Sequence, residues 1–156
     1  MKISNELTPL FQVAEISISY SSQVKPSQRP KIGSSKDACE ILRENWDEGA
    51  MGHHEEMRVL LLNRASKVLG VCLLSVGGLA GTVCDPKIVF QAALKSNASS
   101  IILAHNHPSG NLQPSEADLI LTKKLVKGGG FLDIKVLDHL ILTEEGYLSL
   151  ADQGLM

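Results

Sequence analysis

Short apolar runs alternate with segments of helical periodicity along this chain, and this alternation constrains the fold more than any other feature. The apolar runs have the length of strands, and we expect five of them, over 57–63, 68–76, 99–104, 134–143 and 146–150. Apolar residues at helical spacing predict helices over 34–49, 85–98 and 115–127. Because helices alternate with strands around at least one hairpin, the pattern predicts a three-layer α/β domain with a mixed β-sheet.

The ends of these helices carry recognisable signals. Ser34 or Ser35 is the expected N-cap of the first helix, and Gly49 is expected to end it. Asp85 is the expected N-cap of the second helix. The glycines at 128–130 are expected to break the third helix, since glycine is a poor helix former.

The segment before the first helix has a different character. Residues 12–20 alternate between apolar and polar side chains, which predicts an edge or arm strand. Residues 21–33 are polar, contain two prolines and indicate a linker. We therefore expect an arm and linker over 1–30, followed by a domain over 31–156. Residues 77–81 are expected to form a flexible loop.

The composition excludes several classes of protein. The chain has 15 Lys and Arg against 17 Asp and Glu, so its net charge is -2 and we expect at most weak, salt-sensitive binding to DNA. The cysteines Cys39, Cys72 and Cys84 are odd in number and form no C-x-x-C pair, which disfavours a disulfide framework and fits the cytoplasm. No apolar stretch is long enough for a signal peptide or a membrane helix, so no membrane association is expected.

Polar residues follow the apolar run 101–104, in the sequence LAHNHPSGNLQPSEADL. His105 and His107 are two positions apart at the end of a strand, so both imidazoles can face one cavity. A Pro- and Gly-rich turn follows, and Ser115 and Asp118 are three positions apart at the start of a helix. These residues could also be a strand end, a loop and a helix cap, because S-x-x-D before an apolar run resembles a capping box.

Two imidazoles and one carboxylate are a donor set suited to Zn²⁺. With three protein ligands, the fourth tetrahedral position stays open for water, as in catalytic zinc sites. Such a water needs a general base from outside the metal shell. Glu55 and Glu56 precede the strand over 57–63, and one of them can face the cleft. Both faces of this strand are apolar, so the hydrophobic pattern alone does not decide between them.

A glutamate followed by His-x-His-x7-Ser-x2-Asp resembles the JAMM motif of the MPN/JAB metalloprotease superfamily. The surrounding ILAHNHPSGNLQPSEAD and the later VLDHLIL look like the RadC family within it, and the resemblance covers roughly residues 30–156. It implies a three-layer α/β domain of the JAB/MPN type, similar to cytidine deaminases. Many RadC proteins carry an N-terminal helix-hairpin-helix segment. We expect that segment to be absent here, because only about 30 residues precede the matched region.

The resemblance also implies roles for individual residues. The metal ligands of the family correspond to His105, His107 and Asp118, and its oxyanion-stabilising serine corresponds to Ser115. Its glutamate corresponds to Glu55, four positions before the Val that opens the apolar core of the strand, with Glu56 as the alternative. His53 and His54 are expected in a solvated loop.

Two functions remain open from the sequence. The first is a zinc-dependent metallohydrolase that cleaves a peptide or isopeptide bond of an unknown protein substrate. The second is a non-catalytic, metal-stabilised module that acts in DNA repair or replication by binding DNA or a partner protein. A zinc deaminase is disfavoured because the P-C-x-x-C element of its zinc site is missing. His139 is expected to be a strand histidine with a hydrogen-bonded partner, and the oligomeric state is open.

Overall fold

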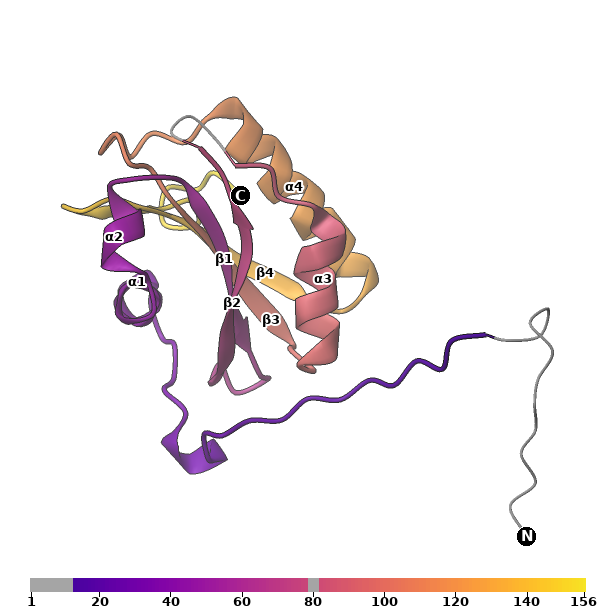
Figure 1. The fold of residues 1–156 in the computed structure, drawn as a ribbon. Helices are drawn as coiled ribbons and strands as arrows, with labels where there is room; N and C mark the ends of the chain where they lie inside the picture. Colours follow the sequence, from indigo (N-terminus) through magenta and orange to yellow (C-terminus); the bar gives the residue numbers. More distant parts are fainter. Residues whose placement is uncertain (1–12, 79–81) are drawn as a thin grey trace, which may run out of the picture.

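A five-stranded mixed sheet lies between two helical layers in the computed structural model, which describes residues 13–78 and 82–156. Figure 1 shows α1 and α2 on one face of the sheet and α3 and α4 on the other. The helices are η2 (Pro26–Gln28, a 3-10 turn), α1 (Ser35–Glu44), α2 (Glu48–Met51), α3 (Pro86–Lys95) and α4 (Glu116–Phe131). The strands are β1 (Glu56–Leu62), β2 (Val68–Val76), β3 (Ser100–Asn106), β4 (Lys135–Leu142) and β5 (Tyr147–Ser149). The expected three-layer α/β architecture is confirmed.

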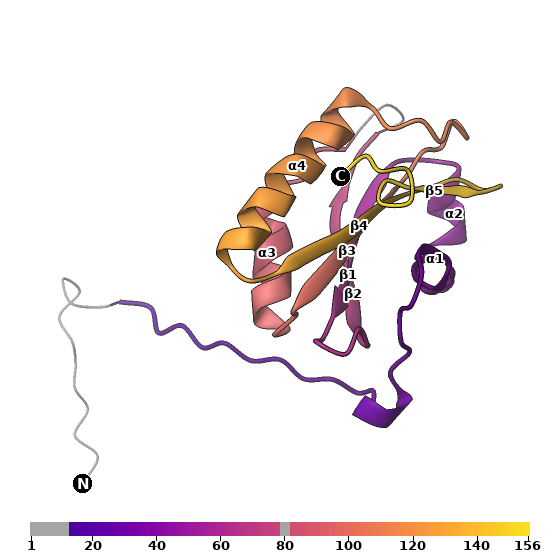
Figure 2. The same cartoon turned by 180° about the vertical axis from the view of Figure 1, so that it is seen from behind.

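The order of the strands across the sheet is β2-β1-β3-β4-β5. β1 pairs antiparallel with β2, which confirms the hairpin that the apolar runs 57–63 and 68–76 predict, and antiparallel with β3. β3 and β4 are parallel, and α4 provides the crossover between them. Figure 2, seen from behind, shows α4 on the same face of the sheet as α3. Every residue of β3 is buried, as expected for a central strand covered on both faces.

Each face of the sheet has its own hydrophobic core. Side chains of β1 and β3 alternate between the two cores, because successive residues of a strand point to opposite faces. The core under α1 and α2 includes Leu42, Trp46, Leu60, Leu62, Ile102, Ala104 and Leu140. The core under α3 and α4 includes Met57, Val59, Leu61, Val89, Ile101, Leu103 and Leu125. A strand residue in one core therefore lies on that face of the sheet, and the residue before or after it lies on the other face.

The predicted starts of the first two helices are confirmed, but the predicted end of the first is wrong. Ser34 caps α1 by accepting a hydrogen bond from the Asp37 N–H, and Asp85 caps α3 in the same way. α1 ends at Glu44 rather than at Gly49. Asp47 then caps a new short helix, α2, so Gly49 lies inside a helix instead of ending one.

The glycines at 128–130 do not break α4, which continues to Phe131. Gly129 is where the helix approaches the following strand most closely. A Cβ atom at this position would lie 2.2 Å from the carbonyl oxygen of Ile134, and the Ile134 N–H donates to the Gly129 carbonyl at 2.9 Å. The glycine therefore serves close packing rather than helix termination.

The predicted strand over 12–20 is also wrong for the described residues 13–20, which have no regular structure. Ile16 and Ile18 are at least 80% exposed. Among the described residues before α1, Lys31 forms an isolated bridge with Lys67, next to β2, and residues 13–20 pair with no strand. Figure 1 shows it running away from the folded body. Residue 12 and residues 79–81 of the expected loop lie outside the described residues.

Candidate metal centre

The end of β3 and the first turn of α4 bring His105, His107 and Asp118 together. One donor atom from each lies within 4.8 Å of the other two. The two Nε2 atoms are 2.9 Å apart. Asp118 Oδ1 is 3.4 Å from Nε2 of His105, and Asp118 Oδ2 is 3.8 Å from Nε2 of His107. The three residues expected from the sequence thus form one cluster.

Local backbone geometry explains why the two histidines point the same way. The His107 N–H donates to the Leu142 carbonyl at 2.9 Å, so the ladder with β4 continues one residue past the end of β3. His105 and His107 then share a face, as alternate residues of an extended strand do. The chain reverses at Gly110, which has a φ of 80° that favours glycine, and reaches α4 within a few residues.

The ring of His107 is oriented by a backbone carbonyl. Its Nδ1 lies 2.6 Å from the carbonyl oxygen of Asn111. A carbonyl only accepts hydrogen bonds, so Nδ1 carries the proton. The lone pair of Nε2 is then directed at the cluster, as a metal ligand requires.

The ring of His105 contacts a second histidine on its far side. His105 is 1% exposed, and its Nδ1 lies 2.8 Å from Nε2 of His139 in β4. His139 is wholly buried, and its Nδ1 lies 2.7 Å from the hydroxyl of Thr122 in α4. The prediction that His139 is a strand histidine with a hydrogen-bonded partner is confirmed. Sequence reasoning missed that the partner is His105, and the only signal was a histidine within an apolar strand.

Ser115 and Asp118 form the capping box that their spacing suggested. The Ser115 hydroxyl oxygen accepts from the Asp118 N–H at 3.1 Å, and the Ser115 N–H donates to Asp118 Oδ2 at 2.7 Å. Oδ1 remains directed at His105. Capping and metal binding therefore use different atoms of Asp118 and are compatible.

Asp118 is held as a carboxylate. Its partial burial acts to raise its pKa, but the hydrogen bond and the charge of His105 and the donors of Ser115 outweigh burial and lower the pKa well below its usual value. The side chain is thus an anionic donor over the whole neutral range of pH.

Glu55 lies on the same face of the sheet as His105. In the register of β1 with β3, Met57 is directly opposite His105, and Glu55 is two residues before Met57. The Glu55 N–H donates to Gly78 at 3.1 Å, and its carbonyl accepts from Gly77 at 2.7 Å, so the strand geometry extends back to Glu55. Its half-buried side chain is thereby placed on the side of the metal cluster, while its catalytic role stays a prediction.

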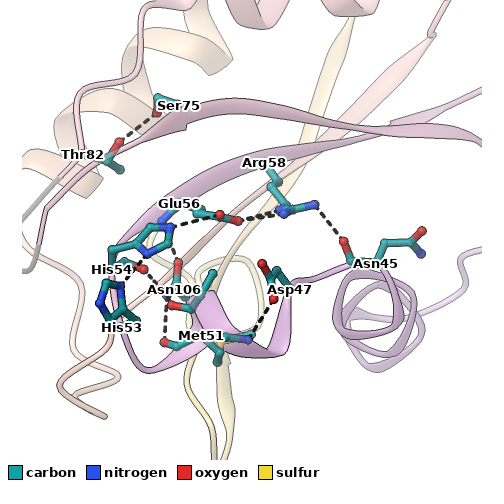
Figure 3. Close-up of polar contacts among 12 residues, drawn as sticks. Asn45, Asp47, Met51, His53, His54, Glu56, Arg58, Ser75, Thr82 and Asn106 are labelled. Atoms are coloured by element: carbon teal, nitrogen blue, oxygen red, sulfur yellow. Dashed lines mark hydrogen bonds and ion pairs between the residues drawn. The ribbon is translucent and has the colours of Figure 1, made fainter.

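Glu56 occupies the opposite face, and donors surround it (Figure 3). Its Oε2 accepts from Nε and Nη2 of Arg58 at 3.1 and 2.8 Å, and its Oε1 is 3.2 Å from Nε2 of His54. The residue is 5% exposed. His53 and His54 lie in the loop before β1, as expected, and neither belongs to the metal cluster.

The donor set fits a tetrahedral divalent cation. Zinc bonds to nitrogen and oxygen of 2.0–2.1 Å place ligand atoms about 3.3 Å apart in a tetrahedron. The two distances from Nε2 of His105, 2.9 Å to Nε2 of His107 and 3.4 Å to Oδ1 of Asp118, lie on either side of that value. Three protein donors leave the fourth position for water or substrate.

Comparison with known proteins gives a consistent picture. Residues 32–155 match the family described as RadC-like JAB domain. A UPF0758 protein of Flavobacterium johnsoniae is 49% identical over 125 residues, which cover 80% of this chain and 53% of the relative. A UPF0758 protein of Thermosynechococcus vestitus is 47% identical over 130 residues, covering 83% and 51%. The chain spans about half the length of the curated relatives it matches.

No helix among the described residues has the length and apolar character needed to cross a membrane.

Proposed function

Because the chain belongs to the RadC-like JAB domain family, we propose that it is a zinc-dependent metallohydrolase that cleaves a peptide or isopeptide bond. The observation that carries this proposal is the cluster of His105, His107 and Asp118, with three donor atoms within 4.8 Å. Two oriented imidazoles and an anionic carboxylate would hold the ion. An open fourth position is typical of catalytic rather than structural zinc sites.

A bound zinc ion would polarise a water molecule and make it more acidic. The residues of the chain supply the other requirements of hydrolysis. Glu55 accepts the proton of the attacking water, since it lies on the same face of the sheet as His105. Arg58 donates its hydrogen bonds to Glu56 and not to Glu55. Removal of that proton makes the water a nucleophile toward the amide carbonyl, and the proton then passes to the leaving amine.

Ser115 donates a hydrogen bond to the carbonyl oxygen as negative charge develops on it. Support comes from its hydrogen bonds in the capping box. The hydroxyl uses a lone pair to accept from the Asp118 N–H, and its own hydrogen remains free to donate. One serine can therefore cap α4 and stabilise the oxyanion together.

The substrate is proposed only as a class. The resemblance to the JAB metalloproteases suggests an amide bond, and the relatives found are named UPF0758 protein, a name that states no substrate.

Metal analysis combined with a cleavage screen tests the proposal. Protein purified without chelator is expected to contain about one zinc per chain. His107→Ala should lose the metal and all hydrolysis of a peptide and isopeptide library. Absence of any transition metal after zinc is supplied would remove the mechanism. Bound metal without hydrolysis, together with submicromolar DNA binding at physiological salt, would favour the non-catalytic module instead.

A further inference from the structure

Asn106 lies between the two histidine ligands in the chain, but its side chain occupies the other face of the sheet, because successive residues of a strand alternate. The residue is wholly buried. Figure 3 shows its amide directed at the loop between α2 and β1, the segment that leads to Glu55. A neighbour of both metal ligands thus contacts the segment that carries the candidate base.

The Asn106 amide is hydrogen-bonded to the backbone just before and at the start of β1. Its Oδ1 accepts from the Glu56 N–H at 2.7 Å. Its Nδ2 donates to the carbonyls of His54 at 2.8 Å and Met51 at 2.9 Å, and lies 3.4 Å from the carbonyl of Ala50. A backbone N–H can only donate and a carbonyl can only accept, so these partners fix which end of the amide is oxygen.

Two of these bonds flank Glu55. The backbone register between β1 and β3 ends at the pair of Met57 with His105. One residue further, the side chain of Asn106 takes the place of a backbone peptide group, because it accepts from the N–H after Glu55 and donates to the carbonyl before it. The N–H and carbonyl of Glu55 itself are bonded to the backbone that follows β2. The main chain at Glu55 is therefore held from both sides.

We propose that Asn106 is a positioning residue that anchors the main chain on both sides of Glu55 to the strand that carries the metal ligands. Because His105 and His107 are its neighbours in the chain, one residue fixes the base relative to two ligands. The anchored backbone leaves Glu55 only the rotations of its own side chain. The role of Glu55 as the base rests on the proposed function, whereas the anchoring does not.

Asn63 provides a matched control at the other end of β1. Its Oδ1 accepts from the N–H groups of Ala65 and Lys67 in the hairpin turn, so it also fixes loop backbone through a side-chain amide. No residue of that turn belongs to the metal cluster. Leucine has the branching of asparagine without its hydrogen bonds. Asn106→Leu and Asn63→Leu therefore remove the same kind of contact at the two ends of one strand.

Hydrogen exchange measured by NMR tests the anchoring without an assay of activity. The side-chain N–H groups of Asn106 should exchange slowly in the wild-type protein, because they are buried and bonded to carbonyls. In Asn106→Leu the Glu56 N–H should exchange about 10-fold faster, since it loses its acceptor. In Asn63→Leu it should exchange as in the wild type.

Kinetics tests whether the anchor acts through Glu55. Asn106→Leu should lower kcat about 10²-fold, the usual cost of a displacement of about 1 Å at a reacting group, with KM and zinc content unchanged. Asn63→Leu should keep the wild-type kcat. In the Glu55→Gln background, Asn106→Leu should lower kcat no further, because no base is left to position. An equal loss in both backgrounds would show that Asn106 serves only the fold, and would overturn the positioning role.

The exchange data separate this inference from the proposed function. Wild-type protein that hydrolyses no peptide but shows the expected exchange at Asn106 and Glu56 would refute the proposed hydrolase and leave the anchor standing. Side-chain N–H groups of Asn106 that exchange as fast as those of an exposed asparagine would overturn the anchor, even in an active enzyme. That measurement needs no variant, so misfolding of Asn106→Leu does not remove the test.

Discussion

Glu55 and Glu56 are the same residue at adjacent positions, yet the sheet places them in opposite surroundings. Glu56 faces α1, where Arg58 and His54 occupy both of its carboxylate oxygens (Figure 3). Glu55 lies on the face of the sheet that carries the cluster of His105, His107 and Asp118. A carboxylate whose oxygens are already bonded is poorly placed to take a proton from water. The face of the strand, rather than the residue type, therefore separates the glutamate bonded to Arg58 from the candidate base.

Changing Glu55 should have the largest effect on catalysis and almost none on the fold. Glu55→Gln keeps the size of the side chain but removes the base, so kcat should fall about 10²- to 10⁴-fold. Zinc content should stay at the wild-type level, because Glu55 is not a ligand. Elemental analysis and a cleavage assay on the same preparation measure both. A metal-free Glu55→Gln protein would show that Glu55 helps to hold the ion, contrary to its assigned role.

The matched substitution on the other face, Glu56→Gln, should destabilise the fold and leave catalysis unchanged. Glu56→Gln leaves the partly buried Arg58 without its anion, and breaking such a pair costs about 3 kcal/mol of unfolding free energy. Solvent screening weakens this ion pair only slightly, because both side chains are at most 14% exposed. Denaturant unfolding gives the loss, and kcat of the folded fraction should match that of the wild type. A large drop in kcat with the fold and the zinc content unchanged would instead identify Glu56 as the base.

Sequence patterns predicted the three-layer fold, the hairpin and the metal cluster because each depends on short-range information. Strand length, helical spacing and the two-residue step from His105 to His107 are all local. The choice between the glutamates is not local. Val59 and Leu60 are both buried, on opposite faces, and only the pairing of Met57 with His105 resolves which glutamate shares the face of the ligands.

The features that the sequence did not predict have two kinds of cause. Residues 13–20 have the alternation of a strand but no partner strand, and alternation alone does not supply hydrogen bonds. Gly49 stopped no helix because Asp47 had already capped another. The link from His139 to His105 crosses between strands 34 residues apart in the chain, a distance at which no spacing rule operates. Contacts between distant elements decided the arm and the histidine pair, whereas the cap at Asp47 is local.

Gly129 and Gly130 repeat the contrast between neighbours on α4, with the smallest expected effects. Gly129 is buried against Ile134, where a Cβ atom would meet a carbonyl oxygen at 2.2 Å, whereas a Cβ atom at exposed Gly130 would meet nothing within 4 Å. Gly129→Ala should therefore destabilise the fold by about 2 kcal/mol through overpacking. Gly130→Ala should stabilise it by about 0.5–1 kcal/mol, since alanine loses less backbone freedom in a helix. Denaturant unfolding of the two variants measures both signs. Equal destabilisation by both would mean that α4 requires glycine flexibility at its end, and that close packing at Gly129 is not the reason for the glycine run.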